Sequence, residues 1–470
     1  MTAPRSIRPA RRALDRVLRS GLALLLLAGC GATPWASESV RPSTAPSVSV
    51  AASPSETAAE PTVVPAPGLD SAIYPPNPGA IVVALDPGHG GCLDWGVPDP
   101  SERGTQLAEK TLTLAIAEEL RDRLEADGIG VVMLREGDEA LAGDFDPRFD
   151  CDGPPWRDVD GDGEAGFEET GRVRTRDELQ ARIDRANLAG ADAFVSIHIN
   201  SLTQDGVVFE LAATQTFYDD ETPWGADRSA ALADGIQAGV VDAIDPLATE
   251  YERQDRGTEA VAYYVISRTW ADGDRCEAAD DTWCKPHRGL QMPGVLSEVG
   301  SITLRAEHDM LASAEGQAAI ADGLFDGLAG WFSERELAAR VALADALVGA
   351  APQPVEGDGP PFWAPVAPDG PIRLRVTNTG TEPIPAGAEL VAGWEESDLP
   401  YLAAEPGDLA VIGDPLPALE PGEAIDVTVE LPPAPGSARG LAWISLSVGS
   451  RTLAEVGSAA LQLANRDPEP

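Results

Sequence analysis

Two histidines stand at the ends of apolar runs that have the character of buried strands. The run in "VVALDPGHGG" ends at a glycine-rich turn that holds His89, and "AFVSIHINS" holds His198 near its end. In an open α/β sheet, the carboxyl ends of parallel strands meet at one edge, where ligands bind. The chain has only four histidines in 470 residues, so two of them at such positions indicate a site at that edge.

Two glutamates belong with these histidines. Glu109 begins a helical pattern after the His89 turn, and Glu298 lies in the late apolar run "GVLSEV". Two imidazoles and a carboxylate form a ligand set typical of zinc, with the fourth position left to water. A second carboxylate beside the metal would serve as the base. Taken singly, a histidine at a strand end is more often structural, so the prediction rests on the whole set.

The elements that would position these side chains follow an α/β pattern. A helix is predicted over 106–126, where apolar residues recur every four positions and Gly128 ends the pattern. Nearly continuous apolar strands alternating with helices predict an open, mostly parallel sheet flanked by helices. The expected strands are "AIVVAL" (80–85), "IGVVML" (129–134), "AFVSIHI" (193–199), "VAYYVI" (261–266) and "GVLSEV" (294–299).

Five segments together resemble a known family. "VVALDPGHGG", "EKTLTLAIAEEL", "TRDELQARIDRAN", "AFVSIHINS" and "MPGVLSEVGS" occur in the order typical of the zinc-dependent N-acetylmuramoyl-L-alanine amidases, over roughly 80–332. The resemblance implies that His89, Glu109 and His198 bind zinc and that Glu298 is the catalytic residue. It also implies a peptidoglycan substrate, with Glu298 accepting a proton from water and returning it to the departing L-alanine nitrogen.

Two other functions remain open. One is a different zinc peptidase that acts on the stem peptides of peptidoglycan, against which the ordered motifs argue. The other is an inactive wall-binding protein, which would have no need of Glu298.

The N-terminus predicts export. Six arginines precede the short apolar run "GLALLLLAGC", which is too short to span a bilayer and is typical of a signal peptide. "LAGC" resembles the bacterial lipobox, which implies a lipid on Cys30 and anchoring to the outer side of the cell membrane; an ordinary signal peptide is the alternative. The Ser-, Pro-, Thr- and Ala-rich residues 30–77 predict a disordered stalk.

Outside the cytoplasm, the four remaining cysteines suggest two disulfides. We favour Cys276–Cys284 and Cys92–Cys151 among the three possible pairings. Two of these cysteines lie in an insertion over 269–285, and Cys151 lies in another over 137–175.

The insertion over 137–175 contains "DVDGDGEAGFEE", which fits the spacing of an EF-hand calcium loop. Carboxylates at loop positions 1, 3, 5 and 12 and a glycine at the sharp turn can surround one calcium ion. A solvated acidic loop is the alternative, because prolines precede the segment. The candidate calcium ligands are Asp158, Asp160, Asp162, Glu164 and Glu169.

The chain carries a formal net charge of −43, and removal of residues 1–29, with six arginines and one aspartate, leaves about −48. Such a surface repels nucleic acid, so we expect no nucleic-acid partner, and we expect a monomer.

Alternating runs such as "PIRLRVTNTG" and "EAIDVTVEL" predict a small Ig-like β-sandwich at the C-terminus. The expected order is signal peptide 1–29, stalk 30–77, catalytic domain 78–335, helix and linker 336–357, and sandwich 358–470.

Overall fold

The structure is a computed structural model. It describes residues 81–91, 94–97, 107–141, 176–204, 207–220, 226–267, 289–344, 352–355, 362–365, 370–395, 409–433, 441–453 and 457–464.

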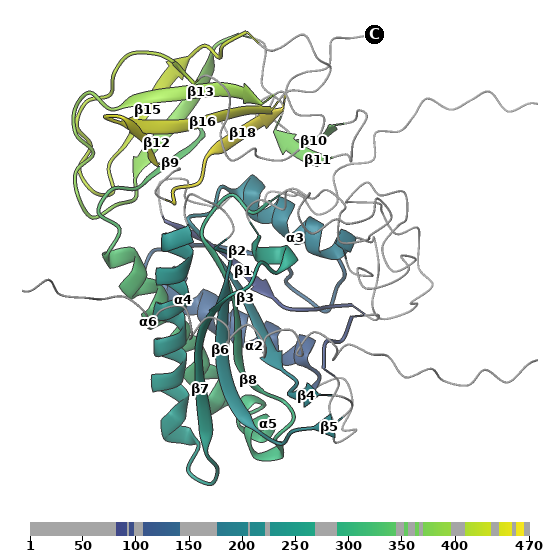
Figure 1. Cartoon of the computed structure of the whole chain (residues 1–470). Coiled ribbons are helices and arrows are strands. Elements are labelled where there is room, and N and C mark those ends of the chain that lie inside the picture. The colour runs from purple at the N-terminus through teal and green to yellow at the C-terminus, as the bar shows by residue number, and fades with distance from the viewer. Residues whose placement is uncertain are drawn as a thin grey trace, which may run out of the picture. The chain divides into compact units, whose positions relative to one another are not determined.

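Six of the described strands form one mixed sheet in the order β2-β1-β3-β8-β6-β7 (Figure 1). The first four run parallel, β6 is antiparallel to β8, and β7 is parallel to β6. The predicted fold class, an open and mostly parallel sheet flanked by helices, is therefore confirmed. The strands are β1 (Val82–Pro87), β2 (Gly130–Met133), β3 (Ala193–Asn200), β6 (Ala212–Tyr218), β7 (Arg253–Ala260) and β8 (Gly294–Ser301).

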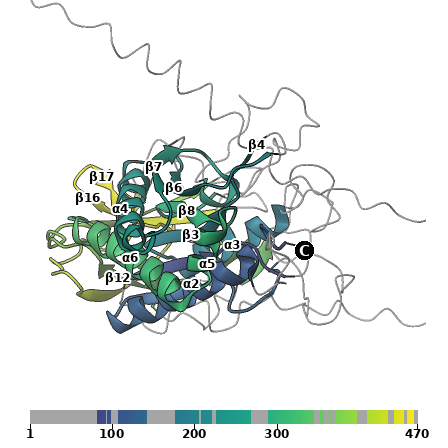
Figure 2. The same cartoon turned by 90° about the horizontal axis from the view of Figure 1, so that it is seen from below.

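Helices cover both faces of this sheet, as Figure 2 shows from below. Alternate residues of β1 face opposite layers: Val83 and Leu85 join the core under α2, α4 and α6, whereas Val82 and Ala84 join the core under α3. Because both faces are buried, the strands are apolar at successive positions. The helices are α2 (Glu109–Ala126), α3 (Arg176–Ala189), α4 (Ala226–Ile244), α5 (Arg305–Leu311) and α6 (Ala314–Ser333), with 3-10 turns η4 (Asp245–Leu247) and η5 (Tyr264–Ile266).

The predicted helix after the His89 turn is confirmed. Its apolar residues at four-residue spacing are at most 2% exposed, because they form the face that packs on the sheet. The helix ends at Ala126, and Gly128 then adopts a φ of 82°, which favours glycine.

One predicted strand is wrong. The run "VAYYVI" (261–266) is not a strand; it follows the edge strand β7 and ends in the 3-10 turn η5. Val265 and Ile266 are buried with the core residues of α3, so the apolar run fills a helix-facing layer instead of adding to the sheet.

The described residues from 339 onward contain strands but no helix, and these strands pair antiparallel. Two sheets, in the orders β15-β12-β9 and β14-β13-β16-β17 with β18 against β16, share one apolar core, as predicted for a β-sandwich. The strands are β9 (Ala339–Leu343), β12 (Ile372–Asn378), β13 (Glu389–Glu395), β14 (Ala410–Val411), β15 (Ala424–Val429), β16 (Leu441–Val448), β17 (Arg451–Thr452) and β18 (Leu461–Ala464). Two further antiparallel pairs are β10 (Pro352–Val355) with β11 (Phe362–Pro365) and β4 (Thr203–Gln204) with β5 (Val207–Val208).

The helix expected within 336–357 is not formed at the described residues of that segment. Residues 339–343 form strand β9, which pairs with β12 and places Val341 in the sandwich core. The alanine-rich sequence favours a helix locally, but cross-strand pairing and burial of alternate side chains outweigh that preference. The all-β part therefore begins about twenty residues before the expected boundary at 358.

Among the described residues, no helix has the length and apolar character needed to cross a membrane.

Candidate metal centre

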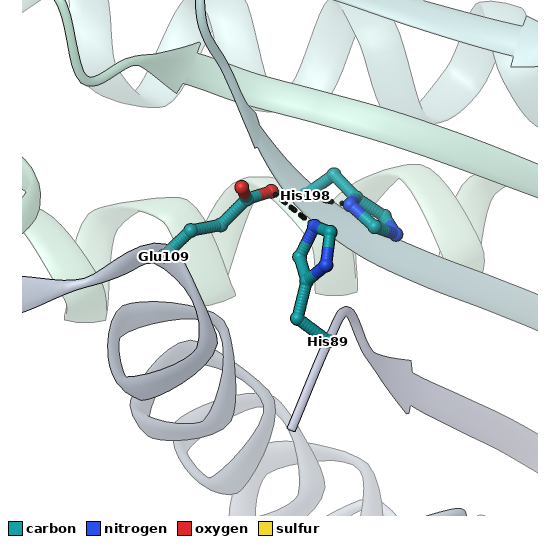
Figure 3. A group of neighbouring side chains, drawn as sticks. All are labelled: His89, Glu109 and His198. Carbon is teal, nitrogen blue, oxygen red and sulfur yellow. Dashed lines mark hydrogen bonds and ion pairs between the residues drawn. The ribbon is translucent and has the colours of Figure 1, made fainter. Parts of the chain in front are cut away.

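Three of the predicted site residues converge on one point, at the end of the sheet where β1 and β3 end (Figure 3). His89 lies in the turn after β1, His198 lies in β3, and Glu109 is the first residue of α2. Glu109 Oε1 is 3.2 Å from His89 Nε2 and 3.1 Å from His198 Nδ1. One ligand atom from each residue falls within a group no wider than 4.8 Å.

The donor set and its spacing fit zinc. Zinc bonds of about 2.0–2.1 Å in a tetrahedron place the ligand atoms about 3.3 Å from one another, close to the two separations observed here. The backbone at two glycines also lies very close to the ligand side chains. A Cβ at Gly88 would lie 2.5 Å from the His198 ring, and one at Gly96 would lie 2.4 Å from Glu109 Oε2. Only glycine at these positions lets the backbone approach the ligands so closely.

The electrostatics of the site favour positive charge at its centre. Burial alone would raise the pKa of Glu109, but His89 and His198 hold that pKa well below its usual range. Burial alone would lower the pKa of His89, whereas Asp94 and Glu109 raise it well above its usual value. Carboxylates that stabilise a cation between them meet the electrostatic condition for a divalent metal ion.

Hydrogen bonds fix the orientation of two of the ligands, His89 and Glu109. Asp94 Oδ1 lies 2.7 Å from His89 Nδ1, which leaves Nε2 to face the centre of the site. The backbone amides of Val97 and Ile199 donate to the two oxygens of Glu109 at 2.8 and 2.9 Å. Partners of this kind hold the ring or carboxylate of a metal ligand in place.

Two buried arginines hold the turn that carries His89. Arg182, from α3, donates to the carbonyls of Pro87 and His89 at 2.9 and 2.7 Å. Arg135 donates to the carbonyls of Pro87 and Gly88 at 2.9 and 3.1 Å. His89 itself has a φ of 63°, a conformation that is costly for a side chain other than glycine. The arginines therefore hold a strained turn in the shape that presents His89 to the site.

Glu298 lies beside the metal-binding group. It is opposite His198 in the β3–β8 pairing, and its Oε2 atom is buried without a hydrogen-bond partner among the described residues. Burial, followed by the charge of Glu109, raises the pKa of Glu298 to about 8. A carboxyl group with a pKa near neutrality can both accept and release a proton.

The remaining predicted site residues lie outside the described residues. These are the calcium candidates Asp158, Asp160, Asp162, Glu164 and Glu169, together with all the cysteines, including Cys30. Three supporting residues were absent from the sequence prediction, namely Asp94, Arg135 and Arg182. Arg182 lies in the quoted segment "TRDELQARIDRAN". The sequence signal that could have identified it is its position as a charged residue beside the apolar Ile183, which is buried in the structure.

Comparison with known proteins gives a consistent set of similarities. A family profile described as N-acetylmuramoyl-L-alanine amidase matches residues 83–330. The uncharacterised protein YqiI of Bacillus subtilis (strain 168) is 26% identical over 252 residues, which are 54% of this chain and 85% of that protein. The germination-specific N-acetylmuramoyl-L-alanine amidase of the same organism is 24% identical over 255 residues, 54% of this chain and 81% of that protein. The solved structure of an N-acetylmuramoyl-L-alanine amidase from Clostridium difficile 630 is 23% identical, with a TM-score of 0.37, and the match covers 55% of this chain and 98% of that one.

Proposed function

Because the chain belongs to the N-acetylmuramoyl-L-alanine amidase family, a family of hydrolases, we propose that it uses zinc to hydrolyse the amide bond between N-acetylmuramic acid and L-alanine in peptidoglycan. The observation that carries the proposal is the convergence of His89, Glu109 and His198 on one point beside Glu298.

His89, Glu109 and His198 would hold the metal ion. Bound there, zinc supplies Lewis-acid chemistry, which polarises a carbonyl oxygen and lowers the pKa of a water molecule. The chain's own contribution is to fix the ligands before the ion binds. Asp94 orients His89, and two backbone amides orient the Glu109 carboxylate, so little rearrangement is needed on binding.

Glu298 would move the proton. Its buried Oε2 atom accepts a proton from the attacking water as the water oxygen bonds to the lactyl carbonyl carbon. The carbon–nitrogen bond then breaks, and Oε2 returns the proton to the L-alanine nitrogen. The same carboxyl group therefore serves first as base and then as acid.

We also propose that the enzyme acts outside the cytoplasm, held to the membrane by a lipid on Cys30 and separated from it by the 30–77 stalk. The signal-like N-terminus and the cell-wall substrate of the family support this location. A structural calcium ion bound by Asp158, Asp160, Asp162, Glu164 and Glu169 remains a proposal supported by the sequence pattern alone.

The proposal is tested by incubating the chain, with zinc or with a chelator, with purified peptidoglycan and identifying the new amino termini. Zinc-dependent release of L-alanine amino termini is the expected result. Glu298→Gln should keep its zinc and lose activity by about 10²–10⁴-fold, whereas His198→Ala should lose both. Glu125→Gln, at an exposed position of α2, is the control and should behave as the unmodified chain.

Other results would contradict the proposal. New amino termini on residues other than L-alanine would indicate a stem-peptide peptidase. Wall binding without cleavage would indicate a binding protein.

A further inference from the structure

A row of polar side chains crosses four adjacent strands and begins at the metal centre. His198 in β3 is in register with Glu298 in β8, and Glu298 is opposite Gln215 in β6. Gln215 Nε2 donates to Glu259 Oε2, on the edge strand β7, at 2.8 Å. Neighbouring strands lie about 4.8 Å apart, so the row extends roughly 10–15 Å from the metal ligands to Glu259.

The order of residues in this row gives the substrate a direction, if the proposed function holds. The carbonyl group under attack must lie at the metal ligands, and the departing nitrogen must lie at Glu298, which returns the proton. The groups attached to that nitrogen belong to the stem peptide. They therefore extend from Glu298 toward the next members of the row, Gln215 and Glu259.

Gln215 and Glu259 together present hydrogen-bond acceptors to this part of the site. Gln215 is only 5% exposed, and because its Nε2 group donates to Glu259, its Oε1 atom remains available as an acceptor. Glu259 is partly exposed, and among the described residues its carboxylate has no lysine or arginine within ion-pair distance. The pair is thus suited to a ligand with N–H groups and positive charge.

Tyr263 lies beside both carboxylates of the row. It packs edge-on against Phe217, with ring centroids 5.1 Å apart. Burial, together with the charges of Glu298 and Glu259, raises the pKa of Tyr263 to about 12. The phenol therefore stays neutral near pH 7 and adds no negative charge beside the carboxylates.

We propose that Gln215 and Glu259 form a subsite for the amino-terminal residue of the stem peptide. In the uncleaved substrate, Gln215 Oε1 accepts a hydrogen bond from a peptide N–H. Cleavage releases an amine, which takes one proton from Glu298 and a second from solvent. An α-amino group has a pKa of about 7.7–8.0, so at pH 7 the product is mostly an ammonium ion, which Glu259 attracts.

Binding of a product-like peptide tests this subsite without relying on catalysis. The zinc-loaded full chain is titrated by calorimetry with trialanine and with N-acetyl-trialanine at pH 6.5 and 9.5. At pH 6.5 we expect trialanine to bind about tenfold more tightly, which corresponds to about 1.4 kcal/mol for one charge-assisted contact. At pH 9.5 the peptide amine is neutral, and the difference should disappear.

Variants separate the two side chains. Glu259→Gln keeps the shape and a hydrogen bond to Gln215 and should abolish the preference for the free amine, while Glu252→Gln, an exposed position just before β7, should retain it. Gln215→Leu should weaken binding of both peptides. Zinc content and circular dichroism verify that each variant is folded.

The outcomes distinguish the subsite from the proposed function. Equal affinity of both peptides at pH 6.5, or a preference that persists in Glu259→Gln, overturns the subsite. If the chain digests peptidoglycan without this preference, only the subsite is wrong. If the preference is present but no L-alanine termini are released, the amidase reaction is wrong and the amine-binding pair stands.

Discussion

At the scale of single residues, Asp86 shows how a buried charge supports the metal centre without touching a ligand. It is 1% exposed at the end of β1, accepts a 2.6 Å hydrogen bond from Ser196 and pairs with Arg182. Arg182 in turn donates to the carbonyl of His89. The charge of Asp86, together with that of Glu178, therefore compensates an arginine that also donates to the His89 turn.

Asp86→Asn should destabilise the protein in a pH-dependent way. Burial alone would raise the pKa of Asp86, but Arg182 and Ser196 lower it below 3.8. A carboxyl group whose pKa is lower in the folded state contributes stability above its unfolded pKa, and this stability is lost as pH falls through the folded value. At pH 7 we expect the variant to lose about 1–3 kcal/mol, because the buried Arg182 keeps only one carboxylate partner, Glu178 at 3.0 Å. Urea unfolding between pH 7 and 3 measures the change.

The difference between the two proteins should be constant down to about pH 4 and shrink below it, since the reference pKa is 3.8. Asp122→Asn breaks a surface pair with Arg121, at 2.9 Å with Asp122 69% exposed, and serves as the control with little effect. A penalty that is equally large at pH 3 would show that the charge of Asp86 is not the source of the stability.

Sequence reasoning found the residues that converge on the metal centre because each lies near or just after the end of a recognisable strand or begins a helix. It did not find Asp94 or Arg135, whose role depends on contacts across the fold. Arg135 donates to Pro87, 48 positions away, and no local pattern encodes that pairing. Strain in the His89 turn likewise becomes visible only in the backbone angles.

At the scale of elements, the strands that could be predicted are those buried on both faces, such as β1 and β3. β6 was missed because it contains buried polar residues that form hydrogen bonds to one another or to neighbouring elements. Thr216 Oγ1, for example, donates to Gln237 at 2.9 Å. Such an interior strand is polar in sequence and does not show the apolar run expected of a buried strand. β7 was missed because it lies at the sheet edge and none of its residues is fully buried, so it has no apolar pattern. In both cases tertiary contacts outweigh local composition.

Close packing of α4 on α6 depends on glycines that face each other. A Cβ at Gly323 would lie 2.5 Å from the carbonyl oxygen of Gly239, closer than real contacts allow. Gly323→Ala should therefore force the helices apart and cost about 1–3 kcal/mol, even though alanine favours a helix. Thermal unfolding followed by circular dichroism measures the loss.

Gly330 provides a control on the same helix. Nothing lies within 4 Å of a Cβ built at Gly330, so Gly330→Ala should gain up to about 1 kcal/mol from helix propensity. If both substitutions shift stability in the same direction, the close contact between the helices is not what requires glycine at 323.

At the scale of the whole molecule, the described parts of Ala66–Ser201 and Glu210–Pro470 belong to one compact unit, and Asp192 joins its α/β and β regions. Asp192 Oδ2 accepts a 3.0 Å hydrogen bond from the backbone of Val82 in β1. Asp192 Oδ1 accepts from Arg335, after α6, at 3.1 Å and from Thr379, after β12, at 3.2 Å. Arg340 in β9 adds a second tie by donating to the carbonyl of Ala189 at 3.0 Å.

Asp192→Ala should uncouple these regions as well as destabilise them. Asp192 and Arg335 are 2% and 3% exposed, so the variant leaves a buried guanidinium without its charge partner, at a cost of about 3–5 kcal/mol. Scanning calorimetry should show one transition for the unmodified chain and a lower, broader or split transition for Asp192→Ala. Asp309→Ala, which breaks the exposed pair with Arg305, should leave the transition almost unchanged. A single transition at the original temperature in Asp192→Ala would mean that contacts other than this carboxylate make the α/β and β regions unfold together.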